Sequence, residues 1–524
     1  LKQNTYPKWF TEGKLGIWAH WGPQAVPMEG DWYARQMYEE GSPKYKHHLE
    51  NYGHPTKFGF KDIIPLWKAE KWDPDRLMKL YKEAGATYFV SMAAHHDNFD
   101  LWNSTHQRWN SVKMGPKRDV VGDWQKAAKK LGLRFGVSEH LGASWTWFQK
   151  SRGADQNGEF KGIAYDGTDP AFEDLYHPKA LPGDTGWYST DPRWHNQWYK
   201  RVKDVVDLYK PDLLYSDGPL PFGPVGESLV AHFYNVTMRG SQQQAVYACK
   251  QPSEGRWAQD VERGVLPDIQ EHPWQIDTSI GDWYYNKNWK YRGAEWVVRM
   301  LVDVVSKNGN LLINVVQHPN GSLDPEAEKV LSDMAAWMKV NGESIYKTQP
   351  WLVYGEGPNR AKGGAFREEF AYTANDVRFV QRGTGTVYAT LMNKPSSSSV
   401  TITCLAKKPG DRGTITGVSV LGQKGKATWK QTELGLELTL PEGSYSHIGT
   451  VIKVKGKDLR EFYSVDPRAG MLPETPAPLV QPGADGVLQL GPKMAKLPES
   501  NMKVETRNGE DNIGYWDNVS DSAI

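Results

Sequence analysis

Ionisable side chains follow four short apolar segments of the sequence, in an arrangement that could support nucleophilic or acid–base chemistry. The segment Leu213–Ser216 ends at Asp217, and Gly218 and two prolines then break the regular backbone. Three other segments end in polar groups in the same way, in His20, in His95, His96 and Asp97, and in Glu139 and His140. A carboxylate so placed can act as a nucleophile, and imidazoles beside it can form hydrogen bonds with a ligand. The arrangement indicates a functional site, and a simple turn at Asp217 is the alternative.

The elements that must position these groups alternate between strand-like and helix-like segments over residues 1 to about 345. Apolar runs too short for a helix occupy residues 15–22, 87–96, 133–140, 213–218, 245–251 and 310–317. Helix starts are indicated between them by the pairs Asp73–Pro74, Asp191–Pro192 and Asp324–Pro325. This alternation favours a (β/α)8 barrel over an open doubly wound sheet, and no glycine-rich nucleotide-binding motif follows any of the strands.

In such a barrel the carboxyl ends of the strands form one rim, where we expect the four polar groups to meet. Side-chain alternation places Asp217 on the same face as Tyr215 and Leu213, so its carboxylate points into the barrel mouth if they line the interior. Metal-ligand types also occur here, namely His20, His95, His96 and Asp97. Adjacent histidines on a strand point to opposite faces, so without a bulge only one of His95 and His96 would face the pocket. Because no spacing is typical of a metal site, we predict no metal and no other cofactor.

Hydrolysis of a glycosidic bond would need a second carboxyl group that holds a proton at neutral pH. The segment 253–274 supplies the candidates, Glu254, Asp260, Glu262 and Glu271. Trp257 and Trp274 lie in the same segment, and their apolar surfaces could raise the pKa of a neighbouring carboxyl group. At least three of the four acids must then be ordinary loop charges.

The sequence pattern changes after about residue 350, where short alternating segments are separated by glycine and proline. This pattern indicates an antiparallel β-sandwich of about 100 residues. The chain then becomes polar and proline-rich, as in a linker, and ends in what resembles the first strands of a further β module. We predict a barrel domain over 1–347, a β-sandwich over 348–454, and a linker with the start of a β module over 455–524.

The composition indicates which classes of partner the protein could bind. The 524 residues include 63 basic and 62 acidic side chains, so nothing favours a nucleic-acid partner. No apolar run approaches ~20 residues, and we expect no membrane span. The 23 Trp and 25 Tyr against 15 Phe fit a sugar-binding protein, because these rings combine an apolar face with a polar group. The absence of a leader at Leu1 fits a secreted or periplasmic chain whose export signal has been removed, and the oligomeric state is left open.

Six motifs occur in one order along residues 8 to about 350. They are KLGIWAHWGP, GDWYARQMY, YFVSMAAHHDNFDLWNS, LYSDG, ERG and NGNLLINVVQHPNG, the last followed by WMKVNGESIY. In this order they resemble glycoside hydrolase family 29, the retaining α-L-fucosidases, in which a β-sandwich usually follows the barrel. The resemblance implies an exo-acting enzyme that releases terminal α-L-fucose from oligo- or polysaccharides by double displacement.

The resemblance also implies roles for the matching residues. Asp217 matches the nucleophile, and Glu262 lies near the acid/base of several relatives, with Glu271 and Asp260 as the next candidates. Contacts to the sugar fall on His20, Asp31, Trp32, His95 and His96. Asp31 is one methylene shorter than the glutamate that many relatives have before this tryptophan.

Further departures concern the third and fifth strands. Many relatives have tyrosines where this chain has Glu139 and His140, which we therefore expect to face the sugar. A sugar-binding arginine that often follows the fifth strand has no clear counterpart near Lys250, and we expect Arg256 or Arg263 to replace it. Trp274 is a further expected sugar contact. These departures leave two alternatives open, an α-L-galactosidase acting on algal galactan oligosaccharides and a non-catalytic sugar-binding protein.

Overall fold

The computed structural model describes residues 1, 4–359, 363–369, 371–425, 427–441, 443, 445–460, 503–507 and 510–514. The chain forms two compact units. The first comprises Leu1–Asp260, Glu271–Leu301 and Asn308–Lys347, and the second comprises Val261–Gln270, Val302–Lys307 and Thr348–Ile524.

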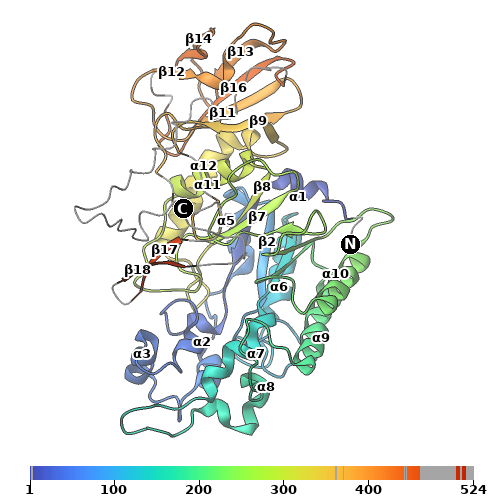
Figure 1. Ribbon diagram of the computed structural model, residues 1–524, viewed down its shortest axis with the longest axis vertical. Helices are drawn as coiled ribbons and strands as arrows, with labels where there is room; N and C mark the ends of the chain where they lie inside the picture. Colours follow the sequence, from blue (N-terminus) through green and yellow to red (C-terminus); the bar gives the residue numbers. More distant parts are fainter. Residues whose placement is uncertain are drawn as a thin grey trace, which may run out of the picture. The chain divides into compact units, whose positions relative to one another are not determined.

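The first unit contains the predicted parallel barrel (Figure 1). Its strands are β1 (Leu15–Ala19), β2 (Tyr88–Ala94), β3 (Arg134–Glu139), β4 (Leu213–Ser216), β5 (Val246–Cys249), β6 (Ala258–Gln259), β7 (Trp274–Ser279) and β8 (Gly309–Asn314). They pair in the order β6-β5-β4-β3-β2-β1-β8-β7. A single parallel bridge between Asp260 and Gln275 joins the two outer strands, and with it the barrel closes.

Helices follow most of the strands, as the sequence predicts, but the described residues between β5 and β7 contain none. They are α1 (Lys8–Gly13), α2 (Tyr33–Gln36), α3 (Pro43–Asn51), α4 (Phe60–Ile63), α5 (Pro74–Glu83), α6 (Val120–Lys130), α7 (Ser144–Trp147), α8 (Glu173–Tyr176), α9 (Pro192–Tyr209), α10 (Pro224–Thr237), α11 (Ala294–Ser306) and α12 (Pro325–Asn341). α9 and α10 lie side by side (Figure 1). The side chains of Asp73 and Asp191 cap α5 and α9 by accepting hydrogen bonds from backbone N–H groups. Asp324 precedes α12 but accepts from the hydroxyls of Tyr285 and Tyr291 instead.

Two barrel strands differ from the expectation that residues 253–274 form one long loop. β6 has only two residues, and β7 (WQIDTS) alternates apolar with polar residues, so neither shows the apolar run that marked the other strands. β7 carries polar residues although all six are buried. A buried strand whose polar side chains point into the barrel does not have the apolar pattern by which strands are recognised.

The second unit contains the predicted antiparallel sandwich. Its strands are β9 (Gln349–Glu356), β10 (Val377–Arg382), β11 (Thr386–Leu391), β12 (Ser399–Ile402), β13 (Thr414–Val420), β14 (Thr428–Gln431), β15 (Leu436–Thr439) and β16 (Thr450–Lys457). One sheet has the order β13-β16-β11-β10-β9 and the other β12-β15-β14. Apolar side chains from both sheets, such as Phe379, Leu436 and Ile452, are fully buried together.

The end of the chain is described in part. β17 (Lys503–Arg507) and β18 (Glu510–Gly514) pair as an antiparallel hairpin. Of the linker predicted to begin at 455, residues 455–457 belong to β16 and the proline-rich stretch 466–486 lies outside the described residues, and a further β module stays a prediction. No helix in the described part of the chain is both long and apolar enough to cross a membrane.

Candidate active site

The carboxyl ends of β1 to β4 deliver the predicted polar residues to one rim of the barrel. His20 follows β1, His95 and His96 follow β2, and His140 follows β3. These four side chains are almost fully buried, with 2–5% of each residue exposed. Asp217 follows β4, and 10% of its side chain is exposed. The structure therefore places them together, as the barrel topology predicts.

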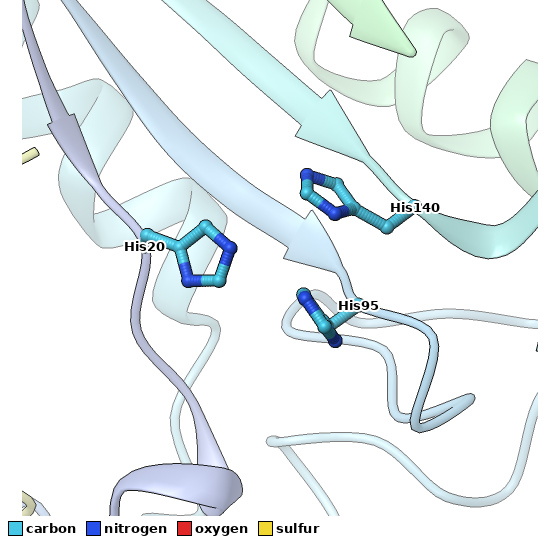
Figure 2. Close-up of side chains that lie close together, drawn as sticks. All are labelled: His20, His95 and His140. Atoms are coloured by element: carbon cyan, nitrogen blue, oxygen red, sulfur yellow. The ribbon is translucent and has the colours of Figure 1, made fainter. Parts of the chain in front are cut away.

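Three imidazoles from successive strands converge at this rim (Figure 2). The ring centroids of His20 and His95 are 5.0 Å apart, and that of His140 lies 5.4 Å and 4.8 Å from them. Burial lowers the pKa of all three, to about 3 for His140, and the proximity of other histidines lowers it further. They are neutral at pH 7, and His20 Nδ1 and His140 Nε2 have no hydrogen-bond partner among the described residues. Neutral imidazoles with unused nitrogen atoms suit the hydroxyl groups of a sugar.

A bulge explains why His95 and His96 both reach the site. The register of β2 against β3 shifts between Met92 and Ala94, where β2 ends. The two histidines then lie in a turn and not on a strand, so strict alternation does not apply to them. His96 Nδ1 donates to the carbonyl oxygen of His140 at 2.6 Å, which leaves His96 Nε2 3.4 Å from Asp217 Oδ2.

Asp217 is surrounded by groups that favour its ionised form. Burial alone would raise its pKa, but the ammonium group of Lys250 and the imidazoles of His140 and His96 outweigh burial and hold the pKa well below its usual range. Lys250 Nζ forms an ion pair with Asp217 Oδ1. The hydroxyl of Tyr215 lies 3.4 Å from the same oxygen. Asp217 is therefore a buried carboxylate that stays charged, as a nucleophile requires.

A pair of carboxyl groups, Asp260 and Asp277, lies inside the barrel, and their pKa values shift in the opposite direction to that of Asp217. Asp260 and Asp277 are 1% and 2% exposed, and burial together with their mutual interaction raises the pKa of Asp260 well above its usual range. Burial also raises the pKa of Asp277, against the effect of Lys250. Tyr215 joins the two regions, because its hydroxyl is 3.2 Å from Asp277 Oδ2. From the sequence, Asp260 was one of the next candidates for the acid/base after Glu262, and Asp277 was not indicated at all.

Asp31 and Trp32 lie beside the histidines. Asp31 Oδ1 is 3.7 Å from His95 Nε2, and Lys44 donates a hydrogen bond to the Asp31 carbonyl oxygen. The ring of Trp32 meets His96 edge to face at a centroid distance of 6.2 Å. Trp32 has a left-handed backbone conformation (φ 61°), which turns it out of α2. Both residues are positioned to contact the same ligand as the histidines.

The loop after β7 contributes two aromatic rings that the sequence pattern did not indicate. Trp283 stacks on His20 at 5.4 Å and 28°, and Tyr284 meets His20 edge to face at 4.7 Å. Trp283 also contacts Trp18, whose indole donates to Ser138 Oγ. The motif GDWYYN (281–286), which begins two residues after the end of β7, was the available signal, and it was overlooked because β7 had not been recognised.

Glu139 is turned toward a helix. Its Oε2 accepts hydrogen bonds from the indole of Trp198 in α9 and from the backbone N–H of Leu141. Burial raises its pKa to about 7, and its hydrogen bonds oppose this only in part. These bonds favour a supporting role, while a direct sugar contact of Glu139 stays a prediction.

Three other predicted residues lie at the opposite, amino-terminal ends of the strands. Trp274 is the first residue of β7 and Glu271 precedes it, with the Glu271 carbonyl oxygen accepting from Asn308. Arg256 precedes β6, stacks on Trp257 and pairs with Glu227 at 3.4 Å. The prediction placed them at the site because it treated residues 253–274 as one loop above the barrel. Trp274 and Arg256 therefore do not lie at the rim where they were expected to contact the sugar. The cation that pairs with Asp217 is Lys250.

The remaining candidates lie elsewhere in the chain. Glu254 is exposed in a turn with φ 51°. Glu262 and Arg263 belong to the second unit, where the Glu262 carbonyl oxygen accepts from Phe366 N and Arg263 pairs with buried Glu368 at 3.2 Å. The role of Glu262 as acid/base stays a prediction.

Two sets of rim residues have donor atoms close enough to hold a metal ion. Each offers three atoms within 4.8 Å of one another: His20, His95 and His140, or His96, His140 and Asp217. The second set suits a cation poorly, because Lys250 already neutralises Asp217. Asp97 belongs to neither set and accepts a hydrogen bond from Phe99 N. A metal ion at the first set would compete for the nitrogen atoms that suit sugar hydroxyls.

Two family models match the sequence of this chain. The sequence model of the family described as Alpha-L-fucosidase matches residues 1–343, and that of the Alpha-L-fucosidase C-terminal domain matches 371–454. Tissue alpha-L-fucosidase of Mus musculus is 27% identical over 463 residues, covering 84% of this chain and 89% of the relative. Plasma alpha-L-fucosidase of Homo sapiens is 28% identical over 369 residues, covering 67% and 71%.

Solved structures agree with the sequence relatives. The crystal structure of Thermotoga maritima alpha-fucosidase in complex with fucose has a TM-score of 0.67 at 27% identity, covering 86% of this chain and 98% of that chain. Its complex with a mechanism-based inhibitor has a TM-score of 0.68, also at 27% identity, covering 87% and 98%. The barrel, the buried carboxylate at the end of β4 and these matches together show that the chain belongs to the alpha-L-fucosidase family, glycoside hydrolase family 29.

Proposed function

We propose that the protein is an exo-acting, retaining α-L-fucosidase that releases terminal α-L-fucose from oligo- or polysaccharides. The observation that carries this proposal is the environment of Asp217, a buried carboxylate kept ionised by Lys250 at a rim of neutral histidines. A pocket of this kind offers hydrogen bonds to several hydroxyl groups and one nucleophilic oxygen. Membership of the alpha-L-fucosidase family indicates that the terminal sugar is L-fucose.

The reaction would proceed by two displacements. Asp217 attacks the anomeric carbon and forms a covalent glycosyl-enzyme while the leaving oxygen receives a proton. Water then attacks the same carbon after losing its proton to the acid/base, and the net configuration is retained. His20, His95 and Trp32 hold the ring, and their hydrogen bonds strengthen as positive charge develops on the sugar.

Glu262 is the acid/base in this proposal. Its support is that it is the glutamate of the ERG motif, together with the positions of the competing acids. Glu271 lies at the amino-terminal end of β7, and Asp260 is buried within the barrel. A retaining mechanism requires the carboxyl oxygens of Asp217 and the acid/base to be about 5–5.5 Å apart.

The alternatives have less support. The two family models, and the relatives and structures compared above, are named for fucose, so no observation favours an α-L-galactosidase. A non-catalytic sugar-binding protein would not need a buried, ionised carboxylate paired with Lys250.

The test uses aryl α-L-fucoside and aryl α-L-galactoside side by side. We expect hydrolysis of the fucoside, with α-L-fucose as the first product seen by NMR before mutarotation. Glu262→Gln should lose most activity toward a disaccharide and much less toward α-L-fucosyl fluoride, whose leaving group needs no proton. β-L-fucose as first product, or preference for the galactoside, would contradict the proposal.

A secreted or periplasmic location is also proposed. Its support is that two relatives, from Homo sapiens and Rattus norvegicus, are named as plasma enzymes. Fractionation of the source cells, with activity assayed in each fraction, would test it.

A further inference from the structure

Trp187 is an exposed aromatic ring beside the buried histidines of the rim. It lies in the loop between α8 and α9, and 40% of the residue is exposed. Its ring meets His96 edge to face at 5.2 Å and 84°, and it stacks against Trp32 at 6.2 Å and 20°. An exposed indole costs hydrophobic free energy unless a ligand covers it. Its contacts with two rim residues indicate which ligand.

The loop that carries Trp187 is fixed to the end of β4. The hydroxyl of Tyr188 lies 2.9 Å from the carbonyl oxygen of Asp217 and 2.6 Å from that of Pro219. Thr146 Oγ1 donates to the Trp187 carbonyl oxygen at 2.9 Å. A Cβ atom on Gly218 would lie only 2.9 Å from Trp187 Nε1. The indole is therefore held directly beside the turn that follows the nucleophile.

Exposure increases from the histidines toward Trp187. His20 and His95 are 3% and 2% exposed, Trp32 is half-buried, and Trp187 is 40% exposed. An exo-acting enzyme buries the terminal sugar, so its leaving group must extend from the buried end toward solvent. Trp187 lies at the open end of this gradient, where the leaving group passes.

We propose that Trp187 is the stacking platform for the leaving-group sugar, so that the enzyme takes substrates whose fucose is linked to a pyranose ring. The inference rests on the proposed function and adds the chemical class of the group next to the fucose. An apolar C–H face of a pyranose covers the indole, and its hydroxyl groups stay in water. Such a platform adds affinity only when the leaving group is a sugar.

The experiment compares two kinds of substrate. α-L-Fucosyl fluoride has no leaving-group sugar, whereas α-L-fucosyl disaccharides of (1→2), (1→3), (1→4) and (1→6) linkage have one. The measured quantity is the ratio of kcat/KM for each disaccharide to kcat/KM for the fluoride. We expect Trp187→Ala to lower this ratio about 5- to 10-fold for the preferred linkage, and Trp187→Tyr to keep it within about twofold, because a tyrosine ring still stacks.

The control is Trp429→Ala, which removes an indole of similar exposure (37%) from β14 of the second unit and should leave the ratio unchanged. A ratio for Trp187→Ala within about twofold of wild type on all four disaccharides would overturn the inference. Equal losses on the fluoride and the disaccharides leave the ratio unchanged, so they would overturn it as well. A wild-type enzyme inert toward α-L-fucosyl fluoride would instead overturn the proposed function, and the inference with it.

Discussion

Buried aspartates at two places in one barrel have pKa values shifted in opposite directions. Asp217 and the pair Asp260–Asp277 are all buried, and the hydroxyl of Tyr215 lies within 3.4 Å of both groups. Lys250 forms its ion pair with Asp217, so that carboxyl group keeps its charge. Asp260 and Asp277 face each other, and burial favours a shared proton. The neighbours of a carboxyl group, and not its depth, decide whether it can act as a nucleophile.

The largest effect is expected from Asp217→Ala. Loss of the nucleophile should lower kcat/KM on aryl α-L-fucoside by at least about 10³-fold, because the covalent intermediate can no longer form. Thermal unfolding should change little. Added azide should restore part of the turnover and yield β-L-fucosyl azide. Nearly unchanged hydrolysis would remove Asp217 from its role.

Lys250→Met should have the next largest effect. Without the ammonium group the pKa of Asp217 rises, so the acid limb of the kcat/KM profile should move to higher pH. The same change leaves a buried charge without its partner, and kcat/KM at pH 7 should fall about 10- to 100-fold. Lys250→Arg, which keeps the charge, should lose less. An acid limb that does not move would contradict the role of Lys250.

Asp277→Asn should have a smaller effect of opposite sign. The substitution removes negative charge near Asp217, so the acid limb should move slightly to lower pH, while kcat/KM falls less than about 10-fold. Asparagine keeps a side-chain oxygen that can accept the hydrogen bond from protonated Asp260. Asp277→Ala cannot, and it should be the more destabilised of the two in thermal unfolding. If the acid limb moved to higher pH, as it should in Lys250→Met, the proposed contrast between Asp217 and the pair Asp260–Asp277 would be contradicted.

Glu139→Gln should change stability in a pH-dependent way. The folded-state pKa of Glu139 is about 7 against an ordinary value of 4.5, so the folded protein binds the extra proton between these values. The contribution of Glu139 to stability therefore falls as pH rises through this window, by at most about 3 kcal/mol. The difference in melting temperature, variant minus wild type, should be a few degrees larger at pH 8 than at pH 5. Exposed Glu271, changed to Gln, is the control, and an equal difference at both pH values would contradict the prediction.

The fold could be predicted wherever a strand is uniformly apolar or a helix has a recognisable start. Asp73–Pro74 and Asp191–Pro192 begin helices as expected, and the six apolar runs all became barrel strands. β6 and β7 were missed because their buried positions include polar groups such as Gln275 and Asp277. Such groups are stabilised by partners across the barrel, and a local pattern contains no information about these partners.

The site could be predicted in part for the same reason. The histidines and Asp217 follow recognisable strands, so the barrel topology alone brought them together. The pairing of Lys250 with Asp217 depends on the geometry between β4 and β5, which spacing does not give. The misplacement of Arg256 and Trp274 came from the missed β6 and β7, because one end of a barrel was taken for the other.

The most direct measurement is a covalent trap of the intermediate. Wild-type enzyme is incubated with 2-deoxy-2-fluoro-α-L-fucosyl fluoride, digested with a protease and sequenced by mass spectrometry. We expect one added 2-fluoro-fucosyl group on the peptide that contains Asp217, and none in Asp217→Ala. A label on Asp260, Asp277 or Glu262, or no label while turnover of the aryl fucoside continues, would contradict the assignment of Asp217 as the nucleophile.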